Sequence, residues 1–242
     1  MKTSNILITV AALVFLTTLV AYDFRLKDQY TSLKKLGLDN YRKLNRFNDY
    51  DQFKIKRFTE LDLQSANTLN VKIEYGEKEA VWVRKHIKDR VSVSQNGEIL
   101  SIDLNRLKDT LEQDWGDIVI ISRDIRKVRT TALKLSKTNE RYFEDFKIVI
   151  EGFKQDSLNI IAGASTRISL HKNKLKSLNS IIGDDSGDGK LTIESDNDVA
   201  AVKINVKGKS TAELLDNEIK YIEHQIADSA IVSFRGRALK DL

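Results

Sequence analysis

The sequence predicts an all-β protein, a β-solenoid with short coils of about 21 residues, preceded by one N-terminal transmembrane helix. Three observations lead to this fold class. An uncharged apolar run fills residues 6–22, a strand-like alternation of period two follows residue 58, and apolar residues then recur at a nearly constant step.

Composition bounds the function classes. The 242 residues are 41% apolar and 31% charged, which is typical of a folded chain. The net charge of +5 is the small difference between 40 basic and 35 acidic residues, so it does not indicate a nucleic-acid partner. The absence of cysteine excludes disulfides, thiolate zinc sites and a cysteine nucleophile.

The run at residues 6–22 reads ILITVAALVFLTTLVAY and follows Lys2. Its 17 residues would span about 25 Å as a helix, the short end of what crosses a bilayer. We interpret residues 1–22 as an uncleaved signal-anchor, because Leu19 and Ala21 make a poor cleavage site. Cleavage with export, and a buried soluble helix, are the alternatives.

Residues 23–57 are a basic connector, with ten basic and four acidic residues between Arg25 and Arg57. Spaced apolar and aromatic residues predict that part of it is helical. It is either a segment that contacts anionic lipid headgroups or a solvated spacer. The counted charges favour a cytoplasmic domain, whereas the short N-terminal tail favours export. We expect an inner-membrane protein whose domain, residues 58–242, faces the periplasm.

Residues 58–130 contain short runs rich in Val, Ile and Leu, such as VSVSQ and EILSIDL. Asn96-Gly97 between these two runs predicts a hairpin with a type I′ turn. Beyond residue 147 two apolar columns keep a step of 21, 21 and 20 residues, which favours stacked coils over a β-sandwich. Their members, expected to point inward, are Ile160, Ile181, Val202 and Ile222, and Leu170, Leu191, Ala212 and Val232.

These runs resemble those of a known family. FTELDLQSANTLNVKIEYGEKEAVWVRK, VSVSQNGEILSIDL and DIVIISRDIRKVRT, after an N-terminal apolar segment, are similar to the putative auto-transporter adhesin head GIN domain family of Bacteroidetes-type bacteria. The resemblance covers residues 58–234. It implies a right-handed β-helix and an envelope-exposed module for binding or structure, although this chain has Arg123-Asp124-Ile125 where the family has a proline-containing run.

Candidate site residues are few. Asp184, Asp185 and Asp188 mimic the start of a calcium loop, but its twelfth position is Ser195, so a plain turn competes with a weak cation site. The three histidines, His86, His171 and His224, share no ligand spacing and are interpreted as rim residues. Trp82 and Trp115 are interpreted as core or cap aromatics rather than sugar platforms.

No catalytic motif and no cofactor motif is found in the sequence, so we expect a non-enzyme without a cofactor. The leading hypothesis is a membrane-anchored, envelope-facing β-helical module that binds an unknown surface ligand or provides structure. A cytoplasm-facing scaffold that polymerises in the manner of bactofilins is the second hypothesis. A carbohydrate-active β-helix enzyme that uses acidic residues such as Asp184, Asp185 and Asp188 is the third.

Overall fold

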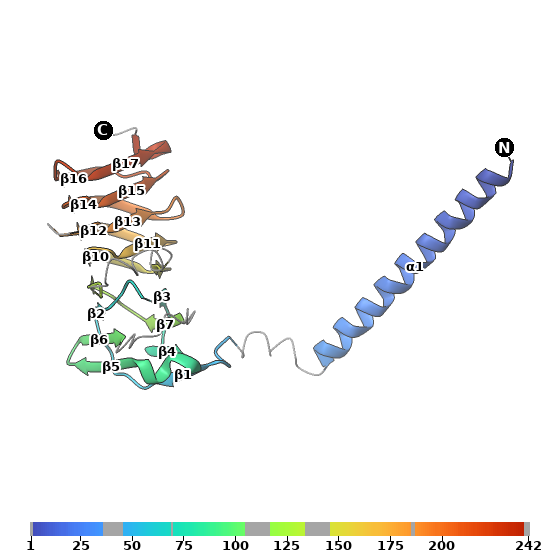
Figure 1. Ribbon diagram of the computed structural model, residues 1–242, viewed down its shortest axis with the longest axis horizontal. Helices are drawn as coiled ribbons and strands as arrows, with labels where there is room; N and C mark the ends of the chain where they lie inside the picture. The colour runs from blue at the N-terminus through green and yellow to red at the C-terminus, as the bar shows by residue number, and fades with distance from the viewer. Residues whose placement is uncertain are drawn as a thin grey trace. The chain divides into compact units, whose positions relative to one another are not determined.

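The structure is a computed structural model that describes residues 2–35, 46–68, 70–104, 117–133, 146–184 and 187–239. The chain forms two compact units, residues 1–49 and 50–242, and each is considered by itself. The first unit contains one long helix, and the second contains the described strands (Figure 1).

Helix α1 runs from Lys2 to Lys35. It continues past the apolar run because residues 2–35 contain neither proline nor glycine. Inside the run, the hydroxyls of Thr17 and Thr18 donate to the carbonyl oxygen of Val14 at 2.9 and 3.0 Å. Among the described residues, no helix combines the length and the apolar character needed to cross a membrane. The transmembrane helix expected at residues 6–22 is therefore corrected to a longer helix whose second half is charged.

The second unit is built from two large sheets. The nine-stranded sheet has the order β1 (Tyr50–Phe53), β4 (Ala80–Arg84), β7 (Asp117–Ser122), β3 (Asn70–Tyr75), β9 (Ile148–Glu151), β11 (Arg167–His171), β13 (Lys190–Ile193), β15 (Thr211–Leu215), β17 (Ile231–Arg235). The eight-stranded sheet has the order β16 (Tyr221–Ile226), β14 (Asp198–Val206), β12 (Lys174–Ile182), β10 (Lys154–Ala162), β8 (Lys127–Thr130), β2 (Glu60–Gln64), β6 (Ile99–Leu104), β5 (Val91–Asn96). Two short 3₁₀ helices are η1 (Lys85–Arg90) and η3 (Gly236–Leu239).

The predicted right-handed β-helix is wrong, because both sheets mix parallel and antiparallel strands. Pairing is parallel from β9 through β17 in one sheet and from β8 through β16 in the other. It is antiparallel between β1 and β4, between β4 and β7, and between β5 and β6. The N-terminal strands are therefore not coils of one uniform solenoid.

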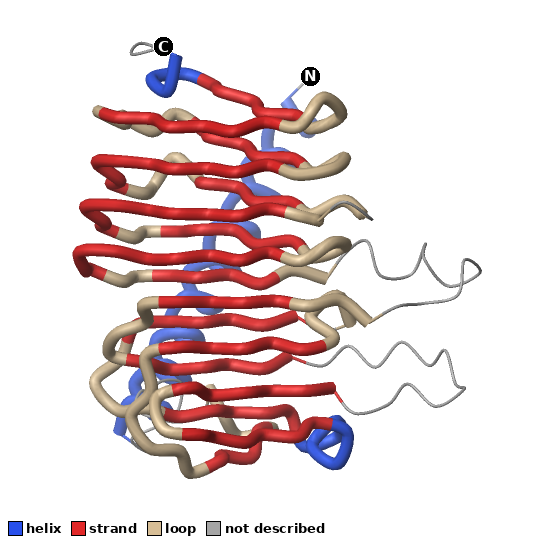
Figure 2. Tube along the Cα trace, turned by 90° about the vertical axis from the view of Figure 1, so that its left-hand side faces the viewer, coloured by secondary structure: helices blue, strands red, loops and turns tan. Residues whose placement is uncertain are grey.

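The hydrophobic core lies between the two sheets. Inward side chains of both sheets form one cluster, with Leu158, Leu178 and Val202 from the eight-stranded sheet and Ile168 and Leu191 from the nine-stranded sheet. Alternation along each strand produces this arrangement, because successive side chains point to opposite faces. Figure 2 shows the strands stacked along the domain, so that each inward residue packs beneath its neighbour on the next strand.

The apolar columns expected from the sequence are only partly correct. Val202 does pair with Ile222, but Ile181 pairs with Ile161 and Asn205 and faces outward. Likewise Leu191, Ala212 and Val232 are in register, whereas Leu170 pairs with Ile193. A slip of one residue moves a side chain to the other face of a sheet, which is why Ile181 was assigned to the core in error.

Unequal turns explain the slip. The segment 183–189 between β12 and β13 has seven residues, whereas 163–166, 207–210 and 227–230 at the equivalent places have four each. Leu158 therefore pairs with Leu178 at a step of 20, but Leu178 pairs with Val202 at a step of 24. The mean step stays near 21 although no pair of adjacent strands in the eight-stranded sheet has that step.

Buried asparagines tie the other turns together. The side-chain amide nitrogen of Asn173 donates to the carbonyl oxygen of Ile150 at 2.9 Å, and that of Asn217 donates to Ile193 at 2.9 Å. Between them, Asn197 donates to the carbonyl oxygen of Leu170 at 2.7 Å. These amides satisfy carbonyl groups where the backbone leaves one sheet for the other.

The hairpin predicted at Asn96-Gly97 is present between β5 and β6, but its turn is displaced by one residue. Asn96 pairs with Ile99, so Gly97 and Glu98 form the two-residue loop. Gly97 has a φ of 59°, and Glu98 does not have a positive φ. Glycine at the first central position fits a type II′ turn rather than type I′.

Candidate functional site

A groove of about 620 Å³ lies on the outer face of the eight-stranded sheet, across β8, β10, β12, β14 and β16. Strand alternation determines its lining. In β12, Leu178 and Ile182 point into the core, whereas Asn179 and Ile181 point outward. Because the five strands are parallel and in register, their outward side chains form two rows that cross the strands.

The first row contains amides between two ion pairs. The side-chain nitrogen of Asn179 donates to the side-chain oxygen of Asn159 at 3.1 Å. The lysine beside each amide is neutralised by a carboxylate: Lys127 lies 3.2 Å from Glu60 and Lys203 lies 2.5 Å from Glu223. The hydrogen bond from Glu223 raises the pKa of Lys203, which therefore remains a protonated donor and not a base.

The second row is apolar at one end and amide at the other. Ile161 pairs with Ile181, and Ile181 is 39% exposed. Further along the row, the side-chain nitrogen of Asn205 donates to the side-chain oxygen of Gln225 at 3.1 Å. The two rows together give an apolar patch bordered by uncharged hydrogen-bonding groups.

This chemistry suits an extended uncharged ligand. A primary amide carries two N–H donors and an oxygen with two lone pairs, so a ladder of single hydrogen bonds leaves further capacity on Asn179, Asn205 and Gln225. The charges beside the groove are already compensated within the protein. A ligand with apolar faces and polar edges would therefore meet partners of both kinds.

A second cluster, on the outer face of the nine-stranded sheet, has the composition of a catalytic triad. The Ser169 hydroxyl lies 3.1 Å from His171 Nε2, and His171 Nδ1 lies 3.5 Å from an Asp196 carboxylate oxygen. Three features argue against nucleophilic catalysis. Ser169 is only 9% exposed, its hydroxyl also donates to Glu194 at 3.3 Å, and β11 is paired on both sides, which occupies the N–H groups that an oxyanion hole needs.

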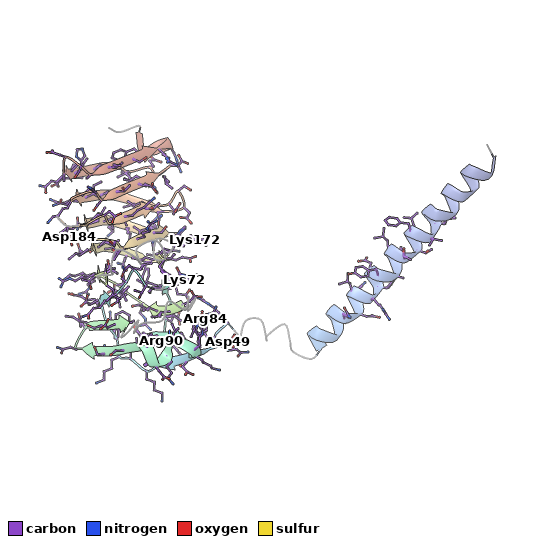
Figure 3. All side chains as sticks on the ribbon, viewed as in Figure 1. Asp49, Lys72, Arg84, Arg90, Lys172 and Asp184 are labelled. Carbon is purple, nitrogen blue, oxygen red and sulfur yellow. The ribbon has the colours of Figure 1, made fainter. Side chains whose placement is uncertain are left out.

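Near this cluster, Glu151 sits between two lysines (Figure 3). Its carboxylate oxygens lie 2.8 Å from Lys172 and 2.8 Å from Lys72. Hydrogen bonds from Lys172 and then Lys72 lower the pKa of Glu151 to about 2. The three side chains come from different strands or turns, so they join neighbouring parts of the sheet and do not form a reactive centre.

The acidic turn does not form a complete cation site in the described residues. Asp184 makes an antiparallel bridge with Gly187, and the carbonyl oxygen of Asp188 accepts from the backbone N–H of Ser165. Asp185 lies outside the described residues. No group of three or more His, Asp or Glu side chains is arranged for a metal ion in the part of the chain that the structure describes. The weak cation site at Asp184, Asp185 and Asp188 stays a prediction.

The histidines are separated. His86 lies on η1, His171 lies on the nine-stranded sheet, and His224 lies on the eight-stranded sheet, where it lines the groove. Trp82 lies on β4, and Trp115 is outside the described residues. Sequence reasoning found none of the groove amides. A signal existed, since Asn159 and Asn179 are separated by the 20-residue step of β10 and β12, and Asn205 and Gln225 by that of β14 and β16.

Comparison with known proteins gives a likeness of fold. No family model matches the chain, and no curated protein matches it in sequence. A crystal structure of a putative adhesin from Bacteroides fragilis is similar with a TM-score of 0.50 and 11% identity, over 77% of this chain and 95% of that one. A putative adhesin from Parabacteroides merdae (TM-score 0.40, 13% identity, 76% and 95% covered) and a lipid binding protein from Parabacteroides distasonis (0.38, 13%, 78% and 93%) are also similar. The β domain thus shares its fold with the Bacteroides fragilis protein, and the identity is too low to show more.

Proposed function

We propose that the protein is a non-catalytic, envelope-facing module that binds a neutral, hydroxyl-rich polymer in the groove of the eight-stranded sheet. The observation that carries this proposal is the pair of amide ladders, Asn159–Asn179 and Asn205–Gln225, beside the exposed Ile161 and Ile181. Sugar rings present C–H faces to apolar side chains and hydroxyl groups to amides. The name of the Bacteroides fragilis protein, a putative adhesin, is consistent with a surface ligand of this kind.

The orientation of the groove supports a polymer rather than a small molecule. The amides and isoleucines repeat from strand to strand, at intervals of about 4.8 Å. A chain of similar units laid across the strands would place one unit after another over equivalent groups. The compensated lysines at Lys127 and Lys203 offer an anionic polymer no additional attraction.

The binding test is affinity electrophoresis of the full chain in gels cast with dextran, xylan or hydroxyethylcellulose, and with polygalacturonate as the anionic comparison. A polyoxyethylene detergent keeps α1 in solution without adding a sugar headgroup. We expect at least one neutral polymer to retard the protein and polygalacturonate to retard it no more. Retardation should weaken at least tenfold in Ile181→Ser and Asn179→Ala.

Lys176→Ala is the matched control, because Lys176 is exposed on the same strand but does not line the groove. Its affinity should equal that of the unmodified chain. No retardation by the three neutral polymers, or equal retardation of the groove variants and the control, would exclude the groove as the binding site.

Contact with a membrane through α1 is a separate part of the proposal. Apolar side chains of this helix are exposed within its own unit, among them Leu13, Phe15, Leu16 and Phe24. They support association with the inner membrane, and the basic residues that follow support contact with anionic headgroups. The domain would then face the periplasm.

Fractionation and a reporter fused after Leu242 test this part. We expect the chain in the membrane pellet after a high-salt wash, and activity of a reporter that works only in the periplasm. An inactive reporter would favour a cytoplasmic domain, and a soluble exported product that begins near residue 22 would favour cleavage. Either result contradicts the proposed location without affecting the groove.

A further inference from the structure

The last strand of the eight-stranded sheet, β16, ends the sheet at its C-terminal side. Along the described strand order, it has a neighbour only on the side of β14. Such an edge presents backbone N–H and C=O groups that can pair with another strand. Natural proteins usually protect edges with lysine, proline or a bulge, yet Tyr221–Ile226 contains no lysine and no proline.

Inward positions that are buried on β14 are exposed on β16. Ile204 is 1% exposed, whereas its register partner His224 is exposed. Val206 is fully buried, whereas its partner Ile226 is 43% exposed. Tyr221 at the start of the strand is 61% exposed. The core columns therefore continue to β16 and stop there without a cover over the edge.

The other structures at the ends of the sheets do not cover β16. At the opposite end, the antiparallel strand β5 closes the eight-stranded sheet, and η1 adds a buried Ile87. At the C-terminal end, η3 packs beside β15 and β17, and the backbone N–H of Arg237 donates to Asp216 at 2.9 Å. The two ends of the domain thus differ, and only the C-terminal one offers an apolar parallel strand as its edge.

We infer that β16 pairs antiparallel with β16 of a second copy, about a two-fold axis at His224. This register places Ile222 opposite Ile226 of the second copy on the inner face. It also places Glu223 opposite Gln225 of the second copy on the outer face, where the amide N–H can donate to the carboxylate. The strand is therefore complementary to itself in both apolar and polar positions, which is why the occupant is another copy of this chain.

The pairing gives a closed dimer and extends the groove. Because the opposite end presents a differently built edge, the contact is isologous and does not propagate into a filament. Glu223, His224 and Gln225 already line the groove, so the groove reaches the edge that the second copy would cover. A six-residue edge is small for an interface, so association should be weak and concentration-dependent.

Disulfide trapping tests the register, because the chain has no cysteine of its own. Opposite residues of an antiparallel pair have Cα atoms about 4.5–5.5 Å apart, within the range of a disulfide. We expect full-length His224→Cys to form a disulfide dimer under mild oxidation. Ile181→Cys is the matched control, since its side chain has similar exposure on the same sheet but lies two strands from the edge. It should give at most one tenth of the dimer.

A second substitution separates edge pairing from association through α1. Ile226→Lys added to His224→Cys should abolish the disulfide dimer, because it places a charge opposite Ile222 of the second copy. Its melting temperature should stay within 2 °C of that of His224→Cys, since Ile226 is exposed in the single chain. Equal cross-linking at positions 181 and 224, no cross-linking at 224, or a dimer that survives Ile226→Lys would overturn the inference.

Discussion

Leu178 and Ile181 are three residues apart on β12 and lie in opposite environments. Leu178 is fully buried between Leu158 and Val202, whereas Ile181 faces the groove. An unpaired carboxylate in the core costs several kcal/mol, which is a large part of the free energy of unfolding of a domain. We therefore expect Leu178→Asp to unfold the β domain and Ile181→Asp to leave it folded, as judged by thermal melts followed by circular dichroism. Equal melting temperatures would contradict the observed register.

Glu151 makes the stability of the domain depend on pH. Its pKa is about 2 in the folded protein, below its usual value of 4.5, because Lys172 and Lys72 hydrogen-bond to the charged form. A carboxyl group whose pKa is lowered on folding stabilises the protein above its unfolded pKa, and this contribution is lost as the pH falls through the folded pKa. The loss should therefore occur between about pH 4.5 and pH 2.

The measurement is the free energy of unfolding in urea at pH 7, 4 and 2.5. Glu151→Gln should lower it by roughly 1 kcal/mol at pH 7, allowing for solvent screening of these partly exposed pairs, and the difference should shrink at pH 2.5. Glu218→Gln, at an exposed turn position, serves as the control and should change little at any pH. A constant difference between Glu151→Gln and the parent chain across the range would contradict the assignment.

At the scale of the elements, the buried asparagines between strands should matter more than those on the groove. Asn173 is 1% exposed, its side-chain oxygen accepts from the N–H of Phe153 at 3.0 Å, and its nitrogen donates to the carbonyl of Ile150. Removing the amide leaves both backbone groups buried without a partner, at about 1–3 kcal/mol each. Asn173→Ala should therefore lower the melting temperature by several degrees, at roughly 2–4 °C per kcal/mol. Asn205→Ala, on the outer face, should lower it by less than 2 °C.

The same asparagines show what the sequence could reveal about the register. Asn173, Asn197 and Asn217 are separated by 24 and 20 residues, and the strands that follow them, β12, β14 and β16, are offset by 24 and 20 residues in their pairing. Apolar residues are a weaker guide, because exposed isoleucines such as Ile181 occur on both faces of a strand. A buried turn amide has one place where it satisfies the backbone, so its spacing follows the true offset.

Local patterns predicted local structure better than they predicted pairing. The Asn96-Gly97 signal located the hairpin because a two-residue loop needs glycine, but the choice of turn type depended on which residue paired with Ile99. The amphipathic alternation located strands, yet β4 and β7 pair antiparallel although neither sequence differs in kind from the parallel strands. Pairing direction depends on contacts between distant segments, and that information is not contained in any single run.

At the scale of the whole molecule, the β domain should fold without α1. Every buried core side chain in the described part of the chain lies at residue 58 or beyond, within the unit of residues 50–242. We expect a fragment of residues 50–242 to melt in a single cooperative transition and to give a strand-type circular dichroism spectrum. Its melting temperature should be the same in excess EDTA and in excess calcium.

The calcium comparison also tests the acidic turn. A cation bound at 100 times its dissociation constant would add about 2.7 kcal/mol to the free energy of unfolding. A rise of several degrees with calcium that Asp184→Ala removes would establish a cation site at Asp184, Asp185 and Asp188. A broad or multiphasic melt in both solutions would instead show that residues 1–49 contribute to folding of the domain.

The groove crosses the strands, so its length depends on how many strands stack and not on how long each one is. Duplication of a gene segment that encodes one strand of each sheet, about 20 residues in the case of β10 and β11, would insert a layer that pairs in parallel on both sides. Each such event would lengthen the groove by about 4.8 Å and leave its chemistry unchanged. Descendants of one ancestral domain could in this way acquire affinity for longer polymers through unequal recombination, without a single substitution in the existing contacts.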